Sequence, residues 1–372
     1  MAARAPRPRR PELFALRASL ARVGAAALAG LVGAGVALEL VLRAGGAPPA
    51  VANPLYSFHQ GDPALGWIGA PGLRQRFVRP AFDVWIEHDA EGFRRPDPPL
   101  PATPQQRLLV LGDSLVWGWG VGQGELATDW LQRALAPRAA VVNRGVDAYA
   151  TSQELLLLER ELARGPWTRV LLVVTPGDLE ENLDGKRGRR PLFALEGGRL
   201  VAHNQPAAPL LGPLRRWWKD SSLAFRWLEL AANRLRLRLE GDAPRAGPRA
   251  PAPAELAAGA AVTARLLLEM DARARAAGAA FEVVRVPTDA ELAGRPADPL
   301  AAAARTLLHD LEANAGLAVV DLGPELARRG AGPGLRFAGD DHPDAQGQRR
   351  IAEALLAHLA GPAPAESGPA RD

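Results

Sequence analysis

Side chains able to perform nucleophilic catalysis occur in two short segments far apart in the sequence. Ser114 directly follows a short apolar run, while Asp340 and His342 lie close to the C-terminal end. A serine hydroxyl becomes a nucleophile when a positioned base takes its proton, and a carboxylate can hold the histidine in the required tautomer. Each residue alone is ordinary, since a serine after a strand commonly caps a helix and an Asp-Asp-His loop is commonly solvated. Their joint placement predicts Ser114 as nucleophile, His342 as general base and Asp340 as its partner.

The surrounding sequence predicts a parallel sheet that brings these residues together. From Arg107 onward, short apolar strands alternate with helical sequence, which is typical of a sheet covered by helices on both faces. In a five-stranded wound sheet, the loops after the first and fifth strands can lie at the same carboxyl edge, where sites form. The predicted strands are Leu108–Leu111, Val141–Val142, Val170–Val174, Phe281–Val286 and Leu317–Asp321, and the predicted helices include about Glu125–Leu135, Ser152–Ala163 and Ala345–Leu359.

The N-terminal segment predicts a membrane anchor. Residues 1–22 hold six arginines against Glu12, and Val23–Leu42 is a run of twenty residues in which Glu39 is the only charge. A helix of this length spans about 30 Å, one hydrocarbon thickness. The arginines predict a cytoplasmic tail for residues 1–22 and an extracytoplasmic position for the chain after Arg43, at the plasma (inner) membrane. A cleavable signal peptide, with its site in Ala44–Ala52, is the alternative.

Three further segments complete the predicted organisation. Residues 43–104 predict a linker followed by a small β-rich lead-in, because apolar residues occupy every second position over Phe82–Glu87. An insertion at about 178–253 predicts a charged Gly/Arg loop and one or two amphipathic helices. These helices could pack on the sheet as a subdomain, lie on the membrane interface or act as a lid. The main domain would then cover residues 105–361, and 362–372 would be a disordered tail.

Composition excludes several other kinds of chemistry. The 372 residues include no cysteine, which rules out disulfides, thiolate nucleophiles and Cys-ligated metals. The net charge of +4 comes from the N-terminal tail, which carries +5, so the rest of the chain is near neutral and no nucleic-acid partner is predicted. A Walker A loop needs a lysine, and the only lysines are Lys186 and Lys219. No metal and no cofactor is expected, because the other histidines are scattered and predicted to lie on the surface: His59, His88, His203, His309 and His358.

Three ordered blocks of sequence resemble the SGNH/GDSL hydrolase family. They are Leu109-Val-Leu-Gly-Asp-Ser-Leu, Val142-Asn-Arg-Gly-Val-Asp-Ala-Tyr-Ala-Thr-Ser-Gln and Asp340-Asp-His-Pro-Asp-Ala-Gln-Gly, and the similarity covers about residues 105–361. The anchor and the lead-in are similar to those of membrane-anchored bacterial members. The resemblance implies an α/β fold of the three-layer αβα, flavodoxin-like type with a five-stranded parallel sheet. It also implies that Ser114 and Gly145 donate backbone N–H groups to the oxyanion.

This chain departs from the family pattern in the third block. The family usually supplies an oxyanion-binding asparagine there, and this chain has Gly177. Losing one such donor costs about 10²–10³ in rate. Asn182, one turn further on, is a candidate replacement, and Asp113 and Trp117 beside the nucleophile complete the predicted substrate-binding set. Trp117 and its neighbour Trp119 are equally compatible with a wall of the acyl pocket or with core packing.

The resemblance implies a membrane-anchored, extracytoplasmic serine esterase that acts on acyl esters of small molecules, glycans or lipids through an acyl-enzyme. An O-acyltransferase acting on cell-envelope glycans would use the same residues. A non-catalytic binding or assembly module is the third interpretation, and the missing asparagine is its main support. The sequence identifies no protein partner.

Overall fold

The structure is a computed structural model that describes residues 10–46, 58–184, 189–204, 218, 221–239, 252–330, 334–338 and 340–361. The chain divides into two compact units. One comprises Met1–Ala52 and Leu211–Arg245, and the other comprises Asn53–Leu210 and Ala246–Asp372. The predicted tail at 362–372, most of the predicted linker and Gly339 lie outside the described residues.

A five-stranded parallel sheet forms the centre of the larger unit, which confirms the predicted fold class. The strand order is β11-β10-β7-β5-β6. Numbered along the chain this is the order 2-1-3-4-5 of flavodoxin-like folds, read from the other edge. The strands are β5 (Gln106–Gly112), β6 (Ala139–Gly145), β7 (Arg169–Val174), β10 (Ala280–Arg285) and β11 (Val319–Asp321).

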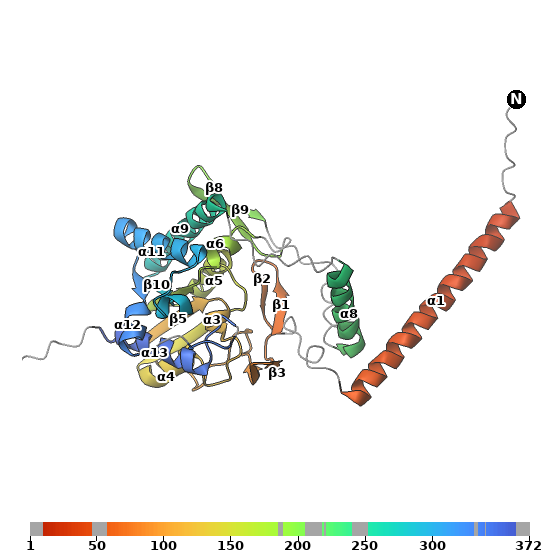
Figure 1. Ribbon diagram of the computed structural model, residues 1–372, viewed down its shortest axis with the longest axis horizontal. Coiled ribbons are helices and arrows are strands. Elements are labelled where there is room, and N and C mark those ends of the chain that lie inside the picture. Colours follow the sequence, from red (N-terminus) through yellow and green to blue (C-terminus); the bar gives the residue numbers. More distant parts are fainter. Residues whose placement is uncertain are drawn as a thin grey trace, which may run out of the picture. The chain divides into compact units, whose positions relative to one another are not determined.

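Helices cover both faces of this sheet, because successive residues of each strand point to opposite sides. Leu109 and Leu111 of β5 belong to one core with α5 (Thr151–Leu162), α9 (Pro253–Ala276) and α11 (Pro299–Ala315). Val110 belongs to a second core. That core includes residues of α3 (Ser114–Trp117), α4 (Ala127–Leu135), α12 (Gly323–Arg328) and α13 (Ala345–Leu359). Figure 1 shows α9 and α11 on one side of the strands and α4, α12 and α13 on the other.

The lead-in consists of two antiparallel hairpins, β1 (His59–Asp62) with β2 (Gly66–Gly69) and β3 (Arg74–Arg79) with β4 (Phe82–Glu87). The predicted alternation holds in β4, where Ile86 is buried and Asp83 and Trp85 are exposed. Phe58, Phe77 and Ile86 form a third core cluster with Trp117 of α3. The lead-in therefore packs directly against the helix that begins at Ser114.

The insertion contains a β-hairpin in addition to the predicted loop and helical sequence. It contains the short helix α6 (Asp178–Glu181) and an antiparallel hairpin, β8 (Leu192–Glu196) with β9 (Arg199–Asn204), before α8 (Leu223–Leu239). The signal for the hairpin is Gly197-Gly198, since a two-residue glycine loop between apolar runs favours a tight β-turn. A further short helix, α10 (Asp289–Leu292), follows β10.

The smaller unit pairs α8 with α1 (Arg10–Gly45). The three interpretations of the predicted amphipathic helices, as a subdomain of the sheet, an interfacial element or a lid, stay predictions. Within α1, Ser19–Gly45 is long and apolar enough to cross a membrane, judged by length and composition alone, and a signal sequence meets the same criterion. The predicted span, Val23–Leu42, lies inside this segment.

Candidate active site

Ser114, His342 and Asp340 form a continuous chain of hydrogen bonds. His342 Nε2 lies 2.8 Å from Ser114 Oγ, and the other ring nitrogen, Nδ1, is hydrogen-bonded to Asp340 Oδ1. About a quarter to a third of each of the two side chains, His342 and Asp340, remains exposed. With Nδ1–H donated to the carboxylate, Nε2 is left as an acceptor for the serine proton. The three residues predicted from the sequence are thus within reach of one another.

A tight strand-to-helix turn positions Ser114. β5 ends at Gly112, and Ser114 is the first residue of the four-residue helix α3. Asp113 caps this helix, because its carboxylate accepts the N–H of Leu115 at 2.9 Å. Gly118 ends the helix in the left-handed region at φ 79°, which favours glycine. The serine is held at the carboxyl edge of the sheet.

A compact loop before α13 positions the histidine. The N–H of Phe337 donates to the carbonyl of His342, and the N–H of Asp340 donates to the carbonyl of Phe337. The N–H of His342 also donates to Asp340 Oδ1 at 3.0 Å, so backbone and ring bind the same carboxylate. Asp344 then caps α13 by accepting the N–H of Gly347. The loop geometry is set by its own hydrogen bonds and by the start of the last helix.

Trp119 contacts both members of the His342–Asp340 pair. Its ring stacks on the imidazole, with centroids 4.9 Å apart, and its Nε1–H donates to Asp340 Oδ2 at 3.1 Å. Partial burial alone would raise the pKa of Asp340, but the hydrogen bonds from His342 and the indole together hold that pKa below its usual value. The sequence singled out Trp119 for its position and did not reveal this contact.

Trp117 is a core residue, which corrects its prediction as a substrate-binding side chain. It is almost fully buried, and its Nε1–H donates to His88 Nε2 at 3.2 Å. His88 is itself buried, contrary to its prediction as a surface histidine, and burial lowers its pKa to about 3. Its Nδ1 lies 3.0 Å from the carbonyl of Ala70, so both ring nitrogens have partners within the lead-in and α3.

The buried side chain of Arg94 holds the loop that follows α3. Its guanidinium donates to the carbonyls of Trp117, Gly118 and Val121 at 2.9–3.2 Å. Burial lowers the pKa of Arg94 to about 10, so the group remains charged at neutral pH. Arg94 belongs to the lead-in, so the lead-in holds the loop that carries Trp119 in place.

Gly145 does not offer the free N–H that the resemblance implies. That N–H donates to the Asn143 side chain at 2.8 Å. Glycine is required here for another reason, since a Cβ at this position would lie 2.4 Å from the backbone nitrogen of Trp117. Within the described part of the chain, the backbone N–H of Ser114 has no hydrogen-bond partner, so it is available to an oxyanion.

Asn182 is also used elsewhere, which corrects its prediction as an oxyanion donor. It is fully buried; its carbonyl oxygen accepts the N–H of Ser152, and its amide donates to Thr263 Oγ1. These contacts join the segment after β7 to α5 and α9. Neither polar atom of this side chain is left for a substrate.

Two carboxyl groups lie close together next to the turn that carries Ser114. Asp113 and Asp178 share the hydroxyl of Thr175, at 3.3 Å and 3.4 Å. Burial and then nearby negative charge raise the pKa of Asp113 to about 7 and that of Asp178 to about 6. Both carboxylate oxygens of Asp113 have hydrogen-bond partners within the protein. Asp113 therefore stabilises the turn, which corrects its prediction as a substrate-binding residue.

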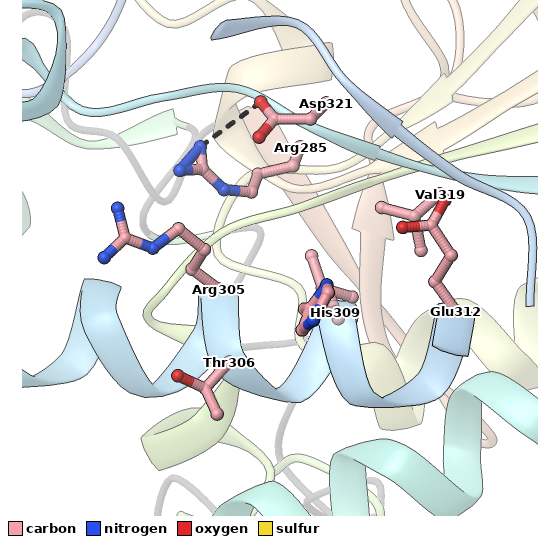
Figure 2. A pocket seen from close by; sticks show the side chains of 8 residues that line it. Arg285, Arg305, Thr306, His309, Glu312, Val319 and Asp321 are labelled. Carbon is pink, nitrogen blue, oxygen red and sulfur yellow. Dashed lines mark hydrogen bonds and ion pairs between the residues drawn. The ribbon is translucent and has the colours of Figure 1, made fainter. Parts of the chain in front are cut away.

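The cavity in Figure 2 lies apart from these residues, beside β11 and α11. It has a volume of about 350 Å³, and Arg285, Arg305 and His309 are among its lining residues. Arg285 lies 2.6 Å from Glu291 and 3.5 Å from Asp321, and the second contact is the dashed line in the figure. Because carboxylates compensate this charge, the cavity offers no strong attraction for an anion.

Solved structures similar to this one include two described as lipolytic proteins of the G-D-S-L family. A member from Veillonella parvula DSM 2008 is 13% identical over 69% of this chain and 99% of its own, with a TM-score of 0.40. TesA is 19% identical over 68% of this chain and 98% of its own, with a TM-score of 0.40. The psychrotrophic esterase EstA from Pseudoalteromonas sp. is 13% identical over 68% and 97%, with a TM-score of 0.39. No family model and no curated protein matches the sequence.

Proposed function

We propose that this chain is a membrane-anchored serine esterase in which Ser114, His342 and Asp340 act on an acyl ester. The observation that carries the proposal is the 2.8 Å contact between His342 Nε2 and Ser114 Oγ, with Asp340 bonded to the other ring nitrogen. A nucleophile within hydrogen-bond reach of a base, which is itself oriented by a third group, is the arrangement that nucleophilic catalysis needs. Trp119 acts as a positioning residue for the base and the acid.

The reaction follows from these contacts. Ser114 Oγ attacks the ester carbonyl while its proton passes to His342 Nε2, and the carbonyl oxygen becomes an oxyanion beside the N–H of Ser114. The intermediate collapses as His342 returns the proton to the leaving alcohol, which leaves an acyl group on Ser114. Water then attacks this acyl-enzyme, giving its proton to His342, and the carboxylic acid departs as Ser114 is restored.

The proposed anchor would hold this chemistry at a membrane. Ser19–Gly45 would span the bilayer, and the arginines before it favour a cytoplasmic N-terminus and an extracytoplasmic sheet unit. Acyl esters of carbohydrates or lipids are the substrates that this location and the sequence resemblance favour. An acceptor hydroxyl in place of water would make the same residues an O-acyltransferase.

A non-catalytic binding module is the second candidate, and one observation favours it. The Gly145 N–H is bonded to Asn143, and Gly177 has no side chain to donate. An oxyanion would then rely on the N–H of Ser114, and each absent donor costs about 10²–10³ in rate. If the chain is an esterase, we therefore expect a low but measurable rate of ester hydrolysis.

A fluorophosphonate probe distinguishes the two candidates in the full-length protein in detergent. Esterase activity predicts labelling that is lost in Ser114→Ala and in His342→Ala but kept in the control Ser221→Ala, whose exposed side chain lies in the smaller unit. Labelling that persists in Ser114→Ala would contradict the assignment of the nucleophile. A folded wild-type protein that neither reacts with the probe nor hydrolyses p-nitrophenyl acetate would favour the binding module.

A further inference from the structure

The first turn of α8 is fastened to α1 by a compact set of polar contacts. The carboxylate of Glu39 accepts the hydroxyl of Ser222 at 2.9 Å and the N–H of Ala224 at 2.8 Å. Arg43 pairs with Glu39 and also donates to the carbonyl of Ser221 at 2.8 Å. The Ser222 hydroxyl in turn accepts the N–H of Phe225 at 3.0 Å. Glu39 and Arg43 of α1 therefore cap α8 in place of solvent.

These contacts define where α8 begins along the apolar segment. Glu39 lies six residues before Gly45, the end of the segment, and six residues of helix rise about 9 Å. Arg43 marks the point where a spanning helix would leave the hydrocarbon. If α1 spans the bilayer, as the proposed function holds, α8 begins at the boundary between acyl chains and headgroups.

The side chains of α8 fit that boundary. Trp227, Leu228 and Leu235 are 39%, 51% and 57% exposed, and Trp218 just before the helix is 49% exposed. Leu228 and Leu235 are seven residues apart and so share one stripe of the helix. Large apolar side chains left exposed in this way mark a contact surface.

The composition of α8 excludes a position inside the hydrocarbon. Its sequence has four arginines and one glutamate over 17 residues. Charged side chains at the bilayer centre are costly, whereas arginine beside tryptophan and leucine is typical of helices that lie in the interface plane. The excess of positive charge favours an anionic lipid surface.

We infer that α8 is an interfacial helix that lies on the anionic surface of the membrane crossed by α1, with Trp227, Leu228 and Leu235 among the acyl chains. The contacts of Glu39 with Ser222 and Ala224 set its depth. This inference rests on the membrane anchor of the proposed function and is independent of its esterase chemistry. It makes α8 a second attachment beside the spanning helix, one that depends on lipid charge.

The absence of cysteine allows a direct test with single spin labels. Leu228→Cys and Leu235→Cys would each carry a nitroxide in the full-length protein, reconstituted in phosphatidylcholine vesicles with and without phosphatidylglycerol. Collisions with oxygen, which concentrates in lipid, are expected to exceed collisions with a water-soluble nickel chelate several-fold, and more so with phosphatidylglycerol. The exposed Glu180→Cys in the sheet unit is the control and should favour the nickel chelate.

Three outcomes would overturn the inference. If the labels at both leucines collide with the nickel chelate as often as the label at the control position does, α8 lies in water. Spectra broadened by neighbouring labels would show that a second copy of the chain covers the stripe. An unchanged depth in Glu39→Gln, which weakens the acceptor at the cap, would remove the role of Glu39.

Vesicle flotation separates this inference from the anchor on which it rests. Full-length protein that does not float with vesicles would contradict the membrane anchor itself. Protein that floats while its labels at Leu228 and Leu235 stay in water would contradict only the interfacial position of α8. Fluorophosphonate labelling reports on the esterase chemistry in either case.

Discussion

The indole ring of Trp119 lies nearly parallel to the imidazole of His342, with centroids 4.9 Å apart and planes inclined by 20°. The same indole donates a hydrogen bond to Asp340 at 3.1 Å. Trp119 also meets Phe77 of β3 edge-on, with centroids 5.1 Å apart. The lead-in thus supports the side chain that holds both the proposed base and its carboxylate partner.

Replacing Trp119 separates the stacking contact from the hydrogen bond. Trp119→Phe keeps an aromatic ring against His342 but loses the N–H, so kcat should fall about 5–10-fold, as expected for a net hydrogen bond of about 1–1.5 kcal/mol. Trp119→Leu loses both contacts, so its kcat should fall further. KM should be nearly unchanged in both variants. Steady-state kinetics with p-nitrophenyl acetate checks this, and Trp85→Phe, a 45% exposed tryptophan in β4, is the matched control.

The pH profile tests whether Trp119 acts by positioning the pair or only by supporting the fold. Its N–H helps to hold the pKa of the Asp340 carboxyl below its usual value, so losing that N–H should raise the pKa of Asp340. Trp119→Phe should therefore move the acid limb of kcat/KM to higher pH. A loss of rate with an unmoved limb and a lowered melting temperature would mean a purely structural role.

Asp340 rather than Asp341 should be the acid that matters. Asp340→Asn removes the carboxylate that is hydrogen-bonded to the ring and backbone of His342, and kcat should fall about 10²–10⁴-fold, as for loss of the acid from a Ser-His-Asp triad. Asp341 is exposed, so Asp341→Asn should leave kcat unchanged. Sensitivity at Asp341 in place of Asp340 would contradict the assignment.

The carboxyl group of Asp113 should make stability depend on pH. Its pKa is raised to about 7, so between about pH 4 and 7 the folded chain binds more protons than the unfolded chain, and the free energy of unfolding falls as the pH rises. Asp113→Asn keeps an acceptor for the N–H of Leu115 and removes this cost. It should raise the free energy of unfolding at pH 8 by up to about 4 kcal/mol, since one pKa unit corresponds to about 1.4 kcal/mol.

Denaturant unfolding of the full-length protein in detergent at pH 4 and pH 8 measures this effect. The gain from Asp113→Asn should shrink towards zero at pH 4, where the wild-type carboxyl is protonated in the folded chain. Asp310→Asn, on the exposed side of α11, should change little at either pH. A variant equally destabilised at both pH values would show that the carboxylate is needed for the cap.

Local sequence patterns predict the five strands of the sheet, although β6 (Ala139–Gly145) is much longer than the predicted Val141–Val142. Apolar runs alternate with helical sequence from β5 onward, and α13 begins and ends where the pattern places it. Because Ser114 and His342 directly follow or precede such elements, their positions at one edge follow from topology. The resemblance to a known family adds the order of the blocks.

Contacts made by the lead-in could not be predicted in the same way. Trp117 and Trp119 are two residues apart and of the same type, yet one is buried against His88 and the other stacks on His342. The turn at Gly118 separates them. Its left-handed backbone conformation, which sends the two side chains to different places, cannot be predicted from the two tryptophans. Arg94 precedes a second arginine and has the pattern of a solvated charge, but its partners are carbonyl groups supplied by tertiary packing.

Restoring an asparagine at position 177 should raise the rate if this residue faces the oxyanion. A Cβ there would lie 3.7 Å from Thr175 Oγ1 and 4.0 Å from Glu181 Oε1, and the backbone has an ordinary φ of −59°, so the side chain fits without strain. Gly177→Asn should increase kcat by about 10²-fold, the lower end of the effect of one oxyanion donor. Gly177→Ala makes the same backbone change without an amide and should leave kcat unchanged. A gain in the asparagine variant alone would mean that a missing donor limits the wild-type rate, whereas equal rates in the two variants would place the oxyanion away from residue 177.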